Sequence, residues 1–207
     1  MIGRLGNSYL NDNLFVRLFQ AQKVLELATF DWQSDHGTAA GSPTKGTTRS
    51  TGRTDYNHKN IDDSTTAYSA APITDGNNSY EIWGFGKFTG TFNQILSGLF
   101  AHTAGTASTG CTLKGPPAMT ADADNRTYTT PSTTTNANLT NNMTSVIAIG
   151  SGVAVWFGAT GPEATGKAAS STNATTYTNW LVTQLQTSGA SAGDTTQMTL
   201  TLQYQEN

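Results

Sequence analysis

Residues 161–167, GPEATGK, match the first seven positions of the P-loop, a motif that binds nucleotide phosphates. In a P-loop, backbone N–H groups cradle the phosphates, the lysine reaches the β- and γ-phosphates, and a Ser or Thr at the eighth position binds Mg²⁺. The eighth residue here is Ala168, and no amphipathic helical pattern follows it. We therefore expect a glycine-rich hairpin loop at this position and no bound cofactor.

Three histidines, His36, His58 and His102, are the next residues that could carry chemistry. They are too few and too far apart for a zinc site of familiar spacing. A Ser–His–Asp triad assembles from distant positions and so stays open, but the chain has no G-x-S-x-G elbow to support one. We expect His36 and His58 to be solvated, and His102 to be a satisfied edge residue at the end of a strand.

Two aspartate pairs, Asp62–Asp63 and Asp122–Asp124, offer the oxygen ligands that a hard cation such as Ca²⁺ prefers. Neither pair lies in a full EF-hand loop, so solvated turn residues are the simpler interpretation. Cys111 is the only cysteine, which excludes an intrachain disulfide and fits a chain made in a reducing cytosol. These residues predict no catalytic, metal-binding or cofactor-binding site, and a protein that is not an enzyme.

Three tryptophans, Trp83, Trp156 and Trp180, lie in segments with strand patterns. If they were exposed together, they could form a platform that stacks against sugar rings; if they were buried, they would fill the core. We favour the core.

The composition indicates which elements must position these residues. Thr, Ser, Asn and Gly make up 90 of the 207 residues, whereas charged residues are only 12%. Such a chain is suited to short strands and turns rather than to long helices. Hydrophobic residues at 36% and a net charge of −3 leave enough apolar surface for a core and argue against disorder. No apolar run is long enough to span a membrane and no secretory leader is evident, so we expect no membrane association.

The segment 14–32 contains most of the helix-forming residues and neither Gly nor Pro. Asn13 or Asp12 would cap a helix there, with Leu10 packing before the cap. Apolar side chains surround this predicted helix almost completely, so other protein must cover it, and a neighbouring subunit would do so. An ordinary packed helix and a strand in the LFVRLF stretch are the alternatives.

Residues 33–79 have the opposite character, with scarcely any large aliphatic side chain. Such a stretch cannot fold by itself and is too long for an internal loop of a compact domain. We expect an extended arm that orders against a partner. Its basic residues are sparse and fit an acidic protein surface better than nucleic acid, so no nucleic-acid partner is expected. They are Lys45, Arg49, Arg53 and Lys59.

From residue 80 onward the apolar positions recur with a period of two. In the last run, Met198, Leu200, Leu202 and Tyr204 share one face, as in a half-buried strand. Further strand patterns lie at residues 80–88, 91–96, 98–103, 126–130, 144–157 and 175–186. The chain is therefore predicted to be mainly β. Residues 80–207 would form an antiparallel β-sandwich or jelly-roll-like domain, and residues 1–79 an N-terminal helix and extended polar arm.

The arm at residues 33–79, the Ala/Gly-Thr strands and the terminal strand SAGDTTQMTLTLQYQEN resemble virion structural proteins of tailed bacteriophages. Capsid decoration (cement) proteins of that kind add a β domain to the outside of a shell and pin neighbouring capsomers together. The resemblance implies a non-enzymatic virion protein, assembled in the host cytoplasm, that binds the major capsid protein or another virion protein. It also implies a homo-oligomer or many copies on one shell, which would raise affinity through avidity.

The residues expected to bind the partner are Leu14, Phe15, Leu18, Phe19, Lys45, Arg49 and Arg53. The alternative function is a carbohydrate- or receptor-binding β-sandwich module of the fibre or adhesin type, which would use an exposed aromatic cluster and need no arm. An enzyme built on a β scaffold is a third and weaker interpretation.

Overall fold

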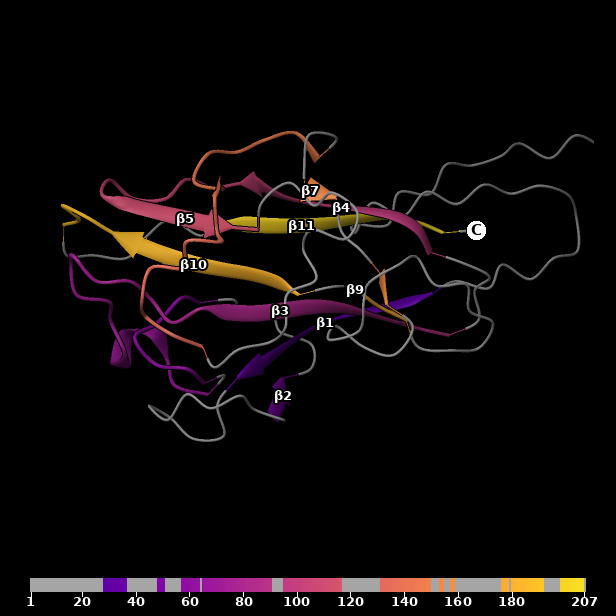
Figure 1. Ribbon diagram of the computed structural model, residues 1–207, viewed down its shortest axis with the longest axis horizontal. Coiled ribbons are helices and arrows are strands. Elements are labelled where there is room, and N and C mark those ends of the chain that lie inside the picture. The colour runs from indigo at the N-terminus through magenta and orange to yellow at the C-terminus, as the bar shows by residue number, and fades with distance from the viewer. Residues whose placement is uncertain are drawn as a thin grey trace, which may run out of the picture.

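The fold is mainly β, with two antiparallel sheets in the part of the chain that the structure describes. The structure is a computed structural model (Figure 1). It describes residues 28–36, 48–50, 57–63, 65–90, 95–116, 131–149, 153–154, 157–158, 176–178, 180–191 and 198–206.

The larger sheet has eight strands in this part of the chain. Six of them follow the order β2-β1-β3-β10-β5-β6, while β9 pairs with both β3 and β8. Their bounds are Thr29–His36 for β1, Thr48–Ser50 for β2, Ile82–Thr89 for β3, Cys111–Gly115 for β5, Asn141–Asn142 for β6, Phe157–Gly158 for β8, Thr176–Thr178 for β9 and Leu181–Thr187 for β10.

The smaller sheet has three strands in the order β11-β4-β7. Strand β4 spans Ile95–Ala104, β7 spans Val153–Ala154, and β11 spans Thr199–Glu206. A single turn of 3₁₀ helix, η1, covers Tyr68–Ala70. The long strands β3, β4, β5, β10 and β11 run along the long axis of the molecule (Figure 1).

Strand β3 is the centre of the larger sheet. On one edge it pairs with β1 over seven residues, from Thr29 opposite Thr89 to Asp35 opposite Trp83. On the other edge it pairs first with β10 and then with β9. Its sequence, IWGFGKFT, places apolar side chains on both faces, and the strand is buried on both.

One face of β3 packs against the smaller sheet through aromatic side chains. Phe88 of β3 meets Tyr204 of β11 edge to face, with ring centroids 4.7 Å apart. Phe30 of β1 stacks on the same tyrosine at 6.0 Å, and Trp32 stacks on Phe100 of β4 at 6.0 Å. Edge-to-face and offset pairs of this kind are worth about 0.5–1.5 kcal/mol each beyond the area they bury. These rings therefore join the two sheets in one core.

Gly86 makes this close packing possible. A Cβ placed on it would lie 2.6 Å from Cε2 of Phe30 and 3.3 Å from Cδ2 of Leu202 in β11. The glycine therefore leaves room for a ring from β1 and a leucine from the other sheet to approach the backbone of β3.

The opposite face of β3 carries a second apolar cluster. Trp180 packs edge to face on Trp83 and on Phe85, with ring centroids 5.6 and 5.2 Å apart. Leu139 and Val182 complete the cluster. Both Trp83 and Trp180 are only 2% exposed, so the prediction that they fill the core is confirmed for these two. Trp156 lies outside the described residues.

The predicted N-terminal helix is wrong where the structure describes it. Residues 14–27 lie outside the described part, but residues 29–32, its predicted last turn, belong to β1. In β1 the side chains alternate. Phe30 and Trp32 face the core between the sheets, and Asp31, between them, lies opposite Lys87 in the register of β1 and β3. The apolar residues from Leu14 to Trp32 also recur at helical spacing, and this led to the prediction of a helix. Residues 29–32 are a strand because they pair with β3, and the pairing fixes which side chains face the core.

The described parts of residues 33–79 do not form an extended arm apart from the sheets. Residues 33–36 continue β1, and β2 pairs with β1 antiparallel. Residues 77–79 run beside β10, where Ser79 N donates to Leu185 O at 2.8 Å. The expectation of a separate arm failed because it was based only on the small number of aliphatic side chains that could be buried. The described parts of this segment are held instead by backbone pairing and polar contacts. That residues 80–207 fold by themselves stays a prediction. No helix in the described residues is long and apolar enough to cross a membrane.

Candidate functional site

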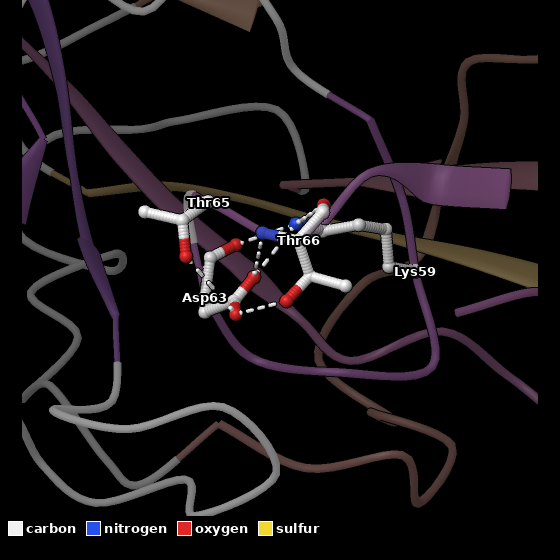
Figure 2. Close-up of polar contacts among 4 residues, drawn as sticks. All are labelled: Lys59, Asp63, Thr65 and Thr66. Atoms are coloured by element: carbon white, nitrogen blue, oxygen red, sulfur yellow. Dashed lines mark hydrogen bonds and ion pairs between the residues drawn. The ribbon is translucent and has the colours of Figure 1, made fainter. Parts of the chain in front are cut away.

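A buried ion pair closes the loop at residues 59–66 (Figure 2). Lys59 Nζ donates to Asp63 Oδ1 at 2.9 Å, to the Asp63 carbonyl at 2.8 Å and to the Thr66 carbonyl at 2.7 Å. All three ammonium protons are thereby used. The two side chains are 5% and 6% exposed, so the pair is shielded from solvent.

Asp63 also accepts hydrogen bonds from its own loop. Its carboxylate receives the backbone N–H of Thr66 at 3.0 Å, the hydroxyl of Thr66, and the hydroxyl of Thr65 at 3.5 Å. Burial alone would raise the pKa of Asp63, but the hydrogen bonds from Thr66 and the contact with Lys59 outweigh it and lower the pKa to about 2. Both carboxylate oxygens of Asp63 therefore already accept hydrogen bonds from donors of this loop.

The expectation that Asp62 and Asp63 are solvated turn acids is wrong, since both are buried. The signal in the sequence was Lys59, four residues before Asp63, together with Thr65 and Thr66 after it. These supply a counter-charge and hydroxyl donors within one loop. The described residues contain no group of three or more His, Cys, Asp or Glu side chains that could hold a metal ion.

A serine and a histidine come together at Ser79 and His58, on the edge of β10. His58 Nδ1 lies 3.2 Å from Ser79 Oγ, and Nε2 lies 3.3 Å from Thr183 Oγ1. The serine is fully buried, donates its hydroxyl proton to the Tyr80 carbonyl at 2.8 Å and accepts from Leu185 N at 3.0 Å. A nucleophile needs a free path to its substrate and a proton that the base can take. This pair has neither, so it anchors residues 57–58 to the sheet.

The prediction that His58 is solvated is therefore wrong. Since the Ser79 proton is used on Tyr80, Ser79 Oγ accepts from Nδ1–H of the ring, and Nε2 accepts from Thr183. A neutral imidazole satisfies both contacts.

A second polar network holds residues 131–139 over the tryptophan cluster. The Glu81 carboxylate accepts from Trp83 Nε1 at 2.9 Å and from Asn136 Nδ2 at 2.6 Å. The Gln184 amide donates to the carbonyls of Ser79 and Thr134, at 3.2 and 3.0 Å, and its oxygen accepts from Asn136 N. The side chains of the sheet thus satisfy backbone groups of a segment that lacks strand partners there.

His102 is fully buried in β4, the middle strand of the smaller sheet, and not at an edge as predicted. The prediction that its ring is satisfied is confirmed: Nδ1 lies 2.6 Å from the Met143 carbonyl and Nε2 lies 2.7 Å from the Ala104 carbonyl. Cys111 is half-buried, and burial, with a smaller contribution from the charge of Asp75, raises the pKa of its thiol.

The structure brings together few of the residues predicted to act in function. Arg49 lies in β2, opposite Asp35 of β1, and His36 pairs in register with Thr48. The remaining candidates lie outside the described residues, namely Leu14, Phe15, Leu18, Phe19, Lys45, Arg53, the Asp122–Asp124 pair and residues 161–167.

Comparison with protein-family models, with curated proteins and with solved structures finds no match to this chain. The polar clusters around Asp63, Ser79 and Glu81 make hydrogen bonds within the chain.

Proposed function

We propose that the chain is a non-enzymatic virion structural protein of the tailed-bacteriophage kind, most specifically a capsid decoration protein that binds and stabilises a phage head. Its two sheets are proposed to be the layers of a β-sandwich with a jelly-roll-like arrangement, which the aromatic contacts from β1 and β3 to β4 and β11 support. The polar clusters of the described residues support a structural role, because their donors and acceptors are engaged within the chain.

The observation that carries the proposal is where the described chain begins and ends. Ala28 is buried in the core between the sheets, and the following strand starts with Thr29 opposite Thr89. Glu206, at the end of β11, lies opposite Ile95. Both ends of the described chain are therefore at the same end of the sheets (Figure 1). In the sequence, the apolar segment 14–27 directly precedes Ala28 and β1.

Such an arrangement suits attachment to a large assembly. The apolar side chains of Leu14, Phe15, Leu18 and Phe19 would enter a groove of the major capsid protein or another virion protein, while the β-sheets stay outside. The basic residues Lys45, Arg49 and Arg53 would add contacts to an acidic surface. Few charges take part, so added salt should weaken binding only modestly. Many copies on one symmetric shell would raise the overall affinity.

The test is co-sedimentation with heads prepared without this protein, from the phage whose genome encodes it. We expect the full chain to bind saturably and to delay heat disruption of the heads. A chain that begins at residue 28 should not bind. The double variant Phe15→Ser, Leu18→Ser should bind at least tenfold more weakly. Its matched control, Arg17→Ser, Gln20→Ser, changes the polar side chains of the same segment and should bind nearly as well as the full chain.

Three results would contradict the proposal in whole or in part. Failure of the full chain to bind any part of the virion would remove the virion assignment, whereas binding to tails alone would remove only the decoration role. Saturable binding to a glycan array by the chain that begins at residue 28 would favour the carbohydrate-binding alternative. That alternative would need aromatic side chains other than Trp83 and Trp180, because these two are buried.

A further inference from the structure

Strand β11 has a strand partner on one side only in the part of the chain that the structure describes. It pairs with β4 along its whole length, and β4 carries β7 on its other side. The register is regular from Leu200 to Gln205, because its two shifts lie at the ends of the strand. In such an antiparallel pair the backbone N–H and C=O groups of alternate residues point away from the partner. The second edge of β11 is therefore a regular row of donors and acceptors.

This edge lacks the features that usually keep an edge strand from pairing. Proteins protect such edges with lysine, proline, a central bulge or a very short strand. Strand β11 is eight residues long, and the stretch from Thr199 to Gln205 contains neither proline nor a charged residue. The edge strands β2, β6 and β7 have only three, two and two residues. Among these edges, β11 is the one that can take a further strand over a useful length.

The leucines of β11 are incompletely covered. Leu200 and Leu202 pack against the core between the sheets, yet both are only partly buried. The residues opposite them in β4, His102 and Phe100, are fully buried. The difference follows from position, because β4 has a strand on each side and β11 has one on a single side. A further strand along the free edge would cover the two leucines, and burial of apolar surface favours association.

We propose that β11 pairs antiparallel with β11 of a second copy of this chain, across a twofold axis. Two identical strands in this arrangement are self-complementary, because each offers the other the same row of donors and acceptors. The distribution of charge favours it as well. Glu206 is the only charged residue of β11, and in an antiparallel pair the two Glu206 side chains lie at opposite ends of the joint. In a parallel pair they would be neighbours and repel each other.

The pairing would join the two smaller sheets into one, in the order β7-β4-β11-β11-β4-β7. Residues directly opposite each other in an antiparallel pair have their side chains on the same face. Registers centred on Thr201, Leu202 or Gln203 therefore place the leucines of both copies on one face and their Thr201 and Gln203 side chains on the other. The apolar cores of the two copies then become continuous at Leu200 and Leu202. The inference concerns self-assembly and does not depend on the proposed attachment to a phage head.

The first test uses the full chain without substitutions. Light scattering during size-exclusion chromatography should give twice the 21.8 kDa of one chain, with dissociation on dilution because a single pair of strands is a small interface. Amide hydrogen exchange measured by NMR should show protection of every backbone N–H from Leu200 to Gln203, whereas an open edge leaves alternate N–H groups to exchange fast. A dimer with that alternating pattern would overturn the proposal. So would a chain that is monomeric at about 1 mM, even with all these amides protected, because a segment of the same chain would then cover the edge.

The second test places like charges across the joint. In the double variant Thr201→Lys, Gln203→Lys, lysines of the two copies lie directly opposite each other in every register named above, and like charges there are destabilising. We expect the dissociation constant to rise at least tenfold, and an equimolar mixture with Thr201→Glu, Gln203→Glu to form the dimer again. The control Thr103→Lys also removes the 2.6 Å contact between the hydroxyls of Thr103 and Thr201, but its charge lies on the middle strand, so it should dimerise like the parent. A dimer that the lysine pair does not weaken would contradict the proposal, and if the variants do not fold, the mass and the amide exchange of the parent decide.

Discussion

At the scale of single residues, Asp63 shows how a polar loop can be rigid without an apolar core. Its folded-state pKa of about 2, against 3.8 for the free side chain, means that the folded state favours the ionised form. Ionisation therefore contributes stability above about pH 4, and this contribution is lost as the pH falls from about 4 towards 2. A shift of this size corresponds to about 2 kcal/mol.

We expect Asp63→Asn to lower the free energy of unfolding at pH 7 by at least about 2 kcal/mol, because Lys59 is then buried without its counter-charge. The difference between variant and parent should shrink at pH 3. Urea unfolding at the two pH values measures both effects. Asp75→Asn is the control: Asp75 is exposed and accepts from Ala190 N, so its change should stay within about 0.5 kcal/mol. An Asp63→Asn chain as stable as the parent at pH 7 would contradict this account of the loop.

The close packing at Gly86 leads to a second prediction about a single residue. Gly86→Ala should destabilise the fold by about 1–3 kcal/mol, because the new methyl group would overlap the ring of Phe30. Replacing that ring with the smaller side chain of leucine, in Phe30→Leu, should relieve the overlap. The double variant should then be less destabilised than the two single changes added together, as a double-mutant cycle from urea unfolding would show. Strict additivity would mean that the two residues do not meet.

At the scale of elements, period-two patterns predicted some strands well and others poorly. The last strand and the run at residues 80–88 are strands as predicted, and residues 95–104 form one strand, β4, across the boundary of two predicted ones. Strand β1 was missed because Trp32 also fits the end of the helical stripe that begins at Leu14. The pairing of β1 with β3 decides between the two periods, and the paired residues lie 48 to 60 positions apart in the sequence, from Asp35 with Trp83 to Thr29 with Thr89.

Strand β11 allows the alternation itself to be tested. Leu202 packs against the core between the sheets, whereas Thr199, the first residue of the strand, is exposed. Leu202→Asp should cost at least about 3 kcal/mol, since it places an unpaired charge in an apolar cluster. Thr199→Asp should cost less than about 1 kcal/mol. Thr201 is a poorer control, because its hydroxyl bonds to Thr103 across the strands. Thermal melts of the two variants measure these losses of stability. An equal fall in melting temperature would mean that both faces of β11 are buried.

At the scale of the whole molecule, composition predicted the fold class but not the division of the chain. A chain rich in Thr, Ser, Asn and Gly with few charges is mainly β, as the two sheets confirm. The polar stretch at residues 57–79 looked unable to fold because its stabilising contacts are hydrogen bonds to distant residues. Ser79 with Leu185 and His58 with Thr183 are examples, each separated by more than 100 residues. Composition does not reveal such distant pairs. The Lys59–Asp63 pair is local, four residues apart, and it was missed because Asp63 was expected to be a solvated turn residue.

Truncation tests how the chain divides. The sequence predicts that residues 80–207 fold without the N-terminal 79, but the contacts of β1 lead to a different expectation. Its removal would leave the edge of β3 without seven paired residues and take Phe30 and Trp32 out of the core between the sheets. We therefore expect a chain that begins at residue 28 to melt cooperatively within a few degrees of the full chain. A chain that begins at residue 78 should aggregate or show no cooperative transition. Size-exclusion chromatography and near-ultraviolet circular dichroism distinguish these outcomes. A cooperative melt of the shorter chain would restore the division at residues 79 and 80, whereas failure of the chain that begins at residue 28 would show that residues 1–27 belong to the core.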